Sequence, residues 1–197
     1  MYISFPKPFW LDGTEESQKT KGFVQWILPK FASDSNPKRW NQELVELASI
    51  DPSTAHPTLL FYIYGEQSRH VTETLAGLNT NHDKEAFLDT MFKPYYSRLP
   101  NYVEENDTCK PTELFATEWL NDDLAGNGSY SNFQVGLGDG DKAIETMRAG
   151  LPDEGVWLAG EHTAPFVALG TATGAYWSGE LIGEHIARAY DKQHPDV

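Results

Sequence analysis

The amino-acid sequence predicts an α+β fold, in which a sheet with helices occupies residues 1–150 and a strand–loop–helix piece occupies residues 151–197. Three observations support this prediction. Short apolar runs of strand length are bounded by turn residues, apolar residues between them recur at helical spacing, and the chain changes character near Leu151. We expect the sheet to be mixed but largely antiparallel, and we place a domain boundary after residue 150.

Three strands are expected in the first third of the chain. Tyr2–Phe5 has the composition of a strand, and Phe23–Leu28 predicts another after the polar turn Asp12–Gly22. Thr58–Tyr64 is a continuous apolar run that ends at Gly65. Such a run is typical of a strand that is buried on both faces.

The pattern then becomes helical. Val71, Leu75 and Leu78 recur at helical spacing, and the same pattern continues in Asp83–Pro94, where we expect the proline to end the helix. A short helix is predicted over Asp141–Arg148, because its first turn is acidic and a glycine follows its end.

The remaining elements are a strand over Glu113–Leu120, a Gly-rich loop over Asn121–Gly128 and a short buried strand over Val156–Ala159. The last of these leads through a loop to a helix that runs from Gly170 to about Tyr190. Since Val156–Ala159 would need neighbouring strands to pair with, this segment predicts unpaired edges if it stands alone.

Composition excludes several classes of protein. The chain has 197 residues, of which 40% are hydrophobic and 22% charged, as in globular domains. A formal net charge of −14 argues against a nucleic-acid partner, since such binding needs clustered Lys and Arg. The single cysteine, Cys109, excludes an intrachain disulfide and indicates a structural thiol. No metal site is predicted.

Membrane insertion and secretion are not expected from the sequence. No stretch approaches the roughly 18 to 20 consecutive apolar residues of a membrane span. The first residues lack the basic and apolar regions of a signal peptide. Localisation stays open on these grounds, with an intracellular location favoured.

The segment after Val156–Ala159 has the residues of a cofactor site. Gly160 and Glu161 follow the predicted strand, where a carboxylate can accept hydrogen bonds from sugar or ribityl hydroxyls. The helix after Gly170 begins with unpaired N–H groups, for which Thr171 or Thr173 can serve as cap. These N–H groups suit the edge of a flavin ring that becomes negative on reduction.

Small residues at the helix start would let its backbone approach a flat ring closely. We expect Ala175, Ile182 and Ile186 to form the apolar face of the helix, with Gly179 allowing close packing against a neighbour. The same glycine-rich start would also serve tight packing alone, and the pattern does not choose between the two uses.

The two segments Gly160–Thr163 and Gly170–Glu180 together resemble the C-terminal flavin motif of the amine oxidase superfamily. This superfamily includes monoamine oxidases, polyamine oxidases and histone lysine demethylases, and the sequence most resembles fungal, polyamine-oxidase-like members. The resemblance covers nearly the whole chain, since further matching segments fall in the family's order: Phe5–Trp10, His56–Gln67, Pro94–Tyr96, Trp119 and Gly128–Ser131.

The resemblance implies an FAD cofactor and assigns its contacts. Glu161 corresponds to the family's glutamate on the flavin ribityl chain, next to Gly160. Ala172 and Thr173 correspond to residues whose backbone meets the pyrimidine end of the ring, and Trp119 corresponds to a tryptophan near the flavin. Residues 1–150 are then an incomplete substrate-binding domain, and residues 151–197 are a fragment of a Rossmann-like FAD-binding domain.

The resemblance also implies a small-molecule amine substrate. Tyr130 and Thr171 fall on the two positions that flank the amine in front of the flavin. Thr171 is not aromatic, which weakens a monoamine assignment. The implied chemistry is hydride transfer from the carbon next to an unprotonated amine, giving an imine that water hydrolyses, while oxygen is reduced to hydrogen peroxide.

Two expected features of the family are missing from the sequence. A G-x-G-x-x-G turn with an acidic residue about 20 positions later is absent, and Gly136–Gly140 has the wrong surroundings to replace it. The family's lysine near flavin N5 would fall just ahead of Met1. We therefore expect a truncated chain: a gene model starting at an internal methionine, a subunit of a split or processed oxidase, or a remnant.

Two hypotheses about function follow. The first is an FAD-dependent amine oxidase fragment that is inactive unless a complementary N-terminal FAD-binding chain completes it. The second is a non-catalytic binding or remnant protein that retains the substrate-domain fold.

Overall fold

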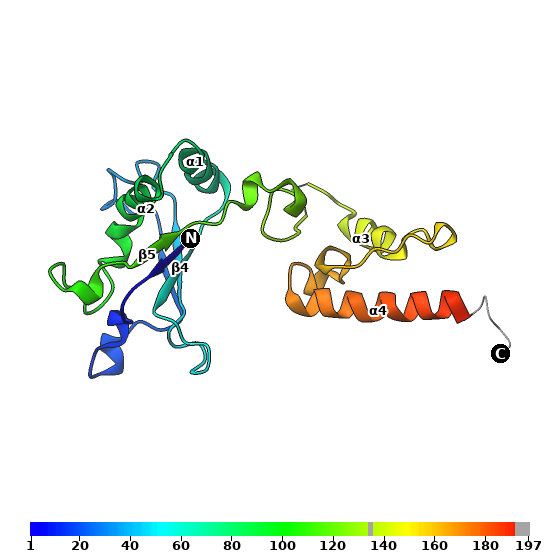
Figure 1. Cartoon of the computed structure of the whole chain (residues 1–197), viewed down its shortest axis with the longest axis horizontal. Coiled ribbons are helices and arrows are strands. Elements are labelled where there is room, and N and C mark those ends of the chain that lie inside the picture. Colours follow the sequence, from blue (N-terminus) through cyan, green and yellow to red (C-terminus); the bar gives the residue numbers. More distant parts are fainter. Residues whose placement is uncertain (134–135, 192–197) are drawn as a thin grey trace. The chain divides into compact units, whose positions relative to one another are not determined.

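The computed structural model describes residues 1–133 and 136–191. The chain forms two compact units, Met1–Asn121 and Asp122–Val197, and we describe each by itself. The described residues form four α-helices and one five-stranded sheet, which confirms the α+β class (Figure 1). The expected boundary after residue 150, between a substrate-binding domain and a fragment of an FAD-binding domain, stays a prediction.

The sheet belongs to the first unit and is antiparallel throughout. Its strands are β1 (Tyr2–Ser4), β2 (Phe23–Trp26), β3 (Gln42–Glu46), β4 (Thr58–Tyr62) and β5 (Glu113–Phe115). They lie in the order β2-β3-β4-β1-β5, and every neighbouring pair is antiparallel. The expectation of a mixed sheet is therefore wrong, because no described pair of strands runs in parallel.

Strand β3 was not predicted, since it buries polar side chains. Gln42 and Glu46 are buried on the same side as Leu44, so the strand lacks an alternation of apolar and polar residues. Gln42 exchanges two side-chain hydrogen bonds of 3.1 Å with Gln67, and Trp10 Nε1 donates to Glu46 Oε2 at 3.1 Å. These partners compensate for the loss of water at the buried polar groups.

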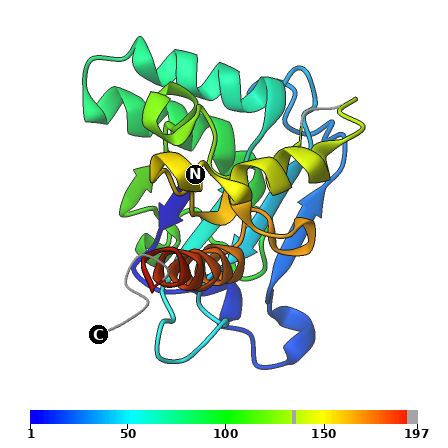
Figure 2. The same ribbon diagram turned by 90° about the vertical axis from the view of Figure 1, so that its right-hand side faces the viewer.

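Two helices, α1 (Gly65–Ala76) and α2 (Asn81–Tyr96), lie on the same side of the sheet (Figures 1 and 2). Pro94 lies inside α2, so the prediction that it ends the helix is wrong. The helix continues for two residues, Tyr95 and Tyr96, and both are fully buried in the core of the first unit. Their burial offsets the cost of the proline in the last turn.

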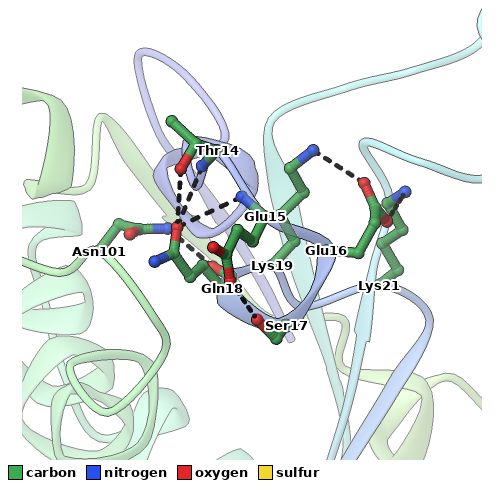
Figure 3. Close-up of polar contacts among 8 residues, drawn as sticks. All are labelled: Thr14, Glu15, Glu16, Ser17, Gln18, Lys19, Lys21 and Asn101. Atoms are coloured by element: carbon green, nitrogen blue, oxygen red, sulfur yellow. Dashed lines mark hydrogen bonds and ion pairs between the residues drawn. The ribbon is translucent and has the colours of Figure 1, made fainter.

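The polar turn before β2 is held by side chains of its own (Figure 3). Gln18 Oε1 accepts hydrogen bonds from the backbone and hydroxyl of Thr14 and from the backbone of Glu15. Asn101 Nδ2 donates to the carbonyl oxygen of Gln18 at 3.1 Å. The turn is thus fastened to a distant segment of the chain without an apolar core of its own.

The second unit contains α3 (Gly140–Ala149) and α4 (Ala172–Asp191), which confirm the two predicted helices. The expected strand Val156–Ala159 does not form. Val156 makes a single antiparallel bridge to Leu151, with N···O distances of 2.9 and 3.0 Å, because no strand lies beside it within the described residues. The predicted strand Glu113–Leu120 is likewise short, since Trp119–Asn121 forms a 3-10 turn.

None of the helices in the described part of the chain is long and apolar enough to cross a bilayer. Cys109 is buried, and its thiol accepts a hydrogen bond from Val103 N at 3.4 Å, as expected of a structural thiol.

Candidate functional site

The candidate site is organised around the carboxylate of Glu161, at the start of the 3-10 turn Glu161–Thr163. Glu161 Oε1 accepts a hydrogen bond from Ser131 N at 3.0 Å. Glu161 Oε2 accepts one from Gly170 N at 2.7 Å. One side chain therefore joins two segments that are about 40 residues apart in sequence, and each segment carries one of the predicted amine-flanking residues.

Tyr130, which precedes Ser131, lies against Gly170. A β-carbon at residue 170 would lie 2.8 Å from Tyr130 Cδ2, and Gly170 has a φ of +72°. Both the contact and the backbone conformation favour glycine there. The Tyr130 ring is half exposed, so one side faces Gly170 while part of the ring stays accessible.

Thr171 is the N-terminal cap of α4, which decides between the two predicted caps, Thr171 and Thr173. Its Oγ1 accepts from Gly174 N at 2.9 Å and donates to the Ala168 carbonyl at 2.7 Å. The hydroxyl is thus engaged on both sides, although the residue itself is exposed. Thr171 can flank a ligand through its methyl group and backbone, while its hydroxyl serves the helix.

The start of α4 packs differently from the prediction. Ala175 is exposed, and among the described residues nothing lies within 4 Å of a β-carbon at Gly179, so neither residue makes the expected packing contact there. The close approach is made by Gly174 instead, where a β-carbon would lie 2.1 Å from the Ala168 carbonyl oxygen. The buried face continues through Ser178 and Ile182, each four residues further on.

Gly160 is tied to this face of α4 through its backbone. Its N–H donates to Ser178 Oγ at 3.0 Å, and its carbonyl accepts from Thr163 Oγ1 at 3.0 Å. Thr163 Oγ1 and Ser178 Oγ are 2.5 Å apart. Arg148 of α3 donates from Nε to the Thr163 carbonyl at 2.8 Å. The turn that carries Glu161 is therefore fixed to both helices of the second unit.

The electrostatics of the site favour an ionised Glu161. Partial burial raises the pKa of its carboxyl, but hydrogen bonds from the Ser131 side chain and from the backbone N–H groups of Ser131 and Gly170 lower it more. The positive field of His162 acts in the same direction, and the net pKa lies below the usual glutamate value. Glu161 is therefore an acceptor at neutral pH.

The residues at the start of α4 fit the edge of a flavin ring. Ala172 and Thr173 are exposed, and they are the first two residues of the helix, whose N–H groups have no intrahelical acceptor. Such donors suit an oxygen that gains negative charge. Their predicted role at the flavin stays a prediction.

Trp119 belongs to the first unit, where it opens the 3-10 turn Trp119–Asn121 and is partly exposed. The other predicted site residues all belong to the second unit: Tyr130, Gly160, Glu161, Thr171, Ala172 and Thr173. The place of Trp119 near the flavin stays a prediction. In the described residues, no group of three or more His, Cys, Asp and Glu could hold a metal ion.

Sequence reasoning missed the residues that hold the site together. Ser131 and Gly170 supply the N–H groups to Glu161, and Ser178 and Thr163 anchor the turn. Only Ser178 leaves a signal in the sequence, since it lies one helical turn after Gly174 on the same face. Backbone donors leave no signal at all.

Comparison with known proteins identifies the family. The model of the flavin-containing amine oxidoreductase family matches residues 1–186, which is most of the chain. Searches of curated proteins and of solved structures find no match. The chain belongs to the flavin-containing amine oxidoreductase family.

Proposed function

We propose that this chain provides the amine-facing residues and the flavin-ring contacts of an FAD-dependent amine oxidase. The observation that carries the proposal is the pair of hydrogen bonds at Glu161, 3.0 Å from Ser131 N and 2.7 Å from Gly170 N. They gather Tyr130 and Thr171 beside the free N–H groups of α4. The family match over residues 1–186 supports the flavin and the amine.

In this proposal FAD, when bound, accepts a hydride from the carbon next to the amine nitrogen. Tyr130 presents its ring to the amine and limits the access of water, so the neutral form of the amine is favoured. Ala172 and Thr173 donate N–H groups toward the pyrimidine edge. The substrate leaves as an imine, which water hydrolyses, and oxygen is reduced to hydrogen peroxide.

The substrate class follows from Thr171. A methyl group and a committed hydroxyl at this position cannot form the second aromatic wall of a cage around a small amine. This favours an extended amine, such as a polyamine or a peptidyl lysine, over a monoamine. The net charge of −14 would steer such cationic substrates toward the protein.

We further propose that a dinucleotide-binding chain or segment completes the enzyme. The sequence contains no G-x-G-x-x-G turn. The second unit also has large apolar side chains exposed to solvent, which are available to a complementary part: Leu124, Leu137, Phe166, Val167, Tyr176 and Tyr190. Both observations support a complementary part that binds the adenine half of FAD.

The test is to purify the chain, add FAD, and record flavin absorbance and hydrogen peroxide release with spermidine, benzylamine and a lysine peptide. The same measurements are repeated with a coexpressed Rossmann-type FAD-binding segment from the family. We expect bound flavin and turnover only in the second arm, and Tyr130→Ala should lower turnover while flavin stays bound. Flavin binding and turnover by the chain alone would overturn the claim of incompleteness.

The absence of flavin binding in both arms would contradict the oxidase proposal itself. That outcome would favour the second hypothesis, a non-catalytic member of the family. Preference for benzylamine over the two extended amines would contradict the substrate class.

A further inference from the structure

We infer that Glu161 is a positioning residue whose carboxylate holds Tyr130 against Gly170 and Thr171 by accepting one backbone N–H from each segment. The inference rests on the proposed function only in treating Tyr130 and Thr171 as the residues that face the amine. The geometry itself concerns this chain alone, so it can be tested without flavin or amine.

The two hydrogen bonds divide evenly between the two carboxylate oxygens. Oε1 accepts from Ser131 N at 3.0 Å, and Oε2 accepts from Gly170 N at 2.7 Å. Ser131 follows Tyr130 directly, and Gly170 precedes Thr171 directly. Because backbone N–H groups are fixed relative to their neighbours, these two bonds set the spacing of the predicted amine-facing residues.

A second observation shows that the two segments are closed against each other. Gly170 leaves no room for a β-carbon beside the Tyr130 ring, which would lie 2.8 Å away. The carboxylate therefore joins two surfaces that already touch, rather than spanning an open gap.

Glu161 is itself held in place. The preceding Gly160 donates to Ser178 Oγ on α4, and Ala164 N donates to the Glu161 carbonyl at 3.1 Å. The side chain therefore extends from a fixed turn, and its reach determines where the Tyr130 segment lies. A residue that only filled space would not need two acceptor atoms.

This role is compatible with a hydrogen bond from a ribityl hydroxyl to the same carboxylate. A carboxylate offers about four lone-pair sites, and the N–H groups of Ser131 and Gly170 use one each. The Ser131 side chain adds a third donor. One lone-pair site is then left for a flavin hydroxyl, so positioning by Glu161 and flavin binding do not compete.

Replacing Glu161 by glutamine separates the effect of side-chain volume from the effect of hydrogen-bond acceptance. Glu161→Gln keeps the volume but replaces one acceptor oxygen by an NH2 group, which must then face a backbone N–H. One of the two bonds is lost whichever way the amide is turned. Glu180→Gln is the matched control, because it makes the same chemical change at an exposed residue of α4.

The experiment is NMR of the isotope-labelled chain without cofactor. We expect the Glu161→Gln variant to lose the downfield shift of the Ser131 or Gly170 amide proton and to exchange that proton about tenfold faster or more. The nuclear Overhauser effect between the Tyr130 ring and Gly170 Hα should weaken. Glu180→Gln should leave all three signals unchanged. Unchanged signals in Glu161→Gln would overturn the inference.

A titration of the unsubstituted chain keeps the test valid if the variant does not fold. The Ser131 and Gly170 amide shifts should follow one midpoint, that of the Glu161 carboxylate, below the usual glutamate value of about 4.3. Among the described residues, the charged group that acts on this carboxylate is His162. Amide shifts that stay flat, or that move separately, would contradict the inference.

Discussion

The backbone of Gly170 touches the ring of Tyr130 so closely that a β-carbon at residue 170 would lie 2.8 Å from Tyr130 Cδ2. This contact unites two segments that sequence reasoning linked only through a family resemblance. It also makes the site sensitive to changes of a single methyl group.

We predict that Gly170→Ala destabilises the start of α4 by about 2 kcal/mol, since a positive φ and a displaced ring add together. Gly155→Ala is the control, because Gly155 has a similar φ of +68° and no described residue lies within 4 Å of a β-carbon there. It should cost about 1 kcal/mol from backbone strain alone. Urea unfolding monitored by circular dichroism measures both free-energy changes, and equal effects would contradict the contact with Tyr130.

Two glycines of α4 are predicted to respond in opposite directions to alanine. Gly174→Ala should lower the free energy of unfolding by roughly 2 kcal/mol or more, because its β-carbon would lie 2.1 Å from the Ala168 carbonyl oxygen. Gly179→Ala, in open space on the same helix, should raise it by up to about 1 kcal/mol. Urea unfolding monitored by circular dichroism gives both values. A destabilising Gly179→Ala would show that this helix face is covered.

Thr171 is predicted to act on stability through its hydroxyl. Thr171→Val keeps the shape but loses the bond to Gly174 N, and should cost about 1 kcal/mol. Thr171→Ser keeps the capping hydroxyl, so its free energy of unfolding should stay within roughly a few tenths of a kcal/mol of the unsubstituted chain. The measurement is the urea midpoint of the three proteins. Equal urea midpoints for Thr171→Val and Thr171→Ser would show that the capping hydroxyl does not contribute to stability.

The buried carboxylate of Glu46 should make the first unit sensitive to acid. Burial raises the pKa of Glu46, but hydrogen bonds from Ser49, Gly22, Trp10 and Ala48 lower it by more. The pKa of Glu46 is therefore lower in the folded chain than in the unfolded chain. A lowered pKa contributes stability that is present above the unfolded value and is lost as the pH falls through the folded value. Stability should therefore decline below about pH 4.3.

Glu46→Gln should remove this part of the pH dependence and cost about 2 to 3 kcal/mol at pH 7, because an NH2 group then faces backbone donors. Glu43→Gln on the same strand is the control, since Glu43 is partly exposed and bonds only to the Gln25 side chain in the described contacts. Urea titrations at pH 7 and pH 4 decide the matter. An unchanged pH dependence in Glu46→Gln would contradict the prediction.

Local patterns predicted much of the first unit and failed where packing overrode them. The apolar run of β4 and the helical spacing of α1 were sufficient for their prediction. Strand β3 was missed because its buried Gln42 and Glu46 are satisfied by partners elsewhere in the chain. The end of α2 was misplaced because buried Tyr95 and Tyr96 carry the helix past Pro94.

By itself, the sequence determined the family, through the motif around Glu161 and the start of α4, and it determined the positions of most helices and strands. Those features depend on side-chain identity at fixed spacing, which a sequence displays directly. Only the tertiary structure decided that Glu161 accepts from Ser131 and Gly170, and that Gly174 rather than Gly179 makes the close approach. Backbone N–H groups and carbonyls make these contacts, and since every residue carries them, no pattern of side chains reveals which ones meet.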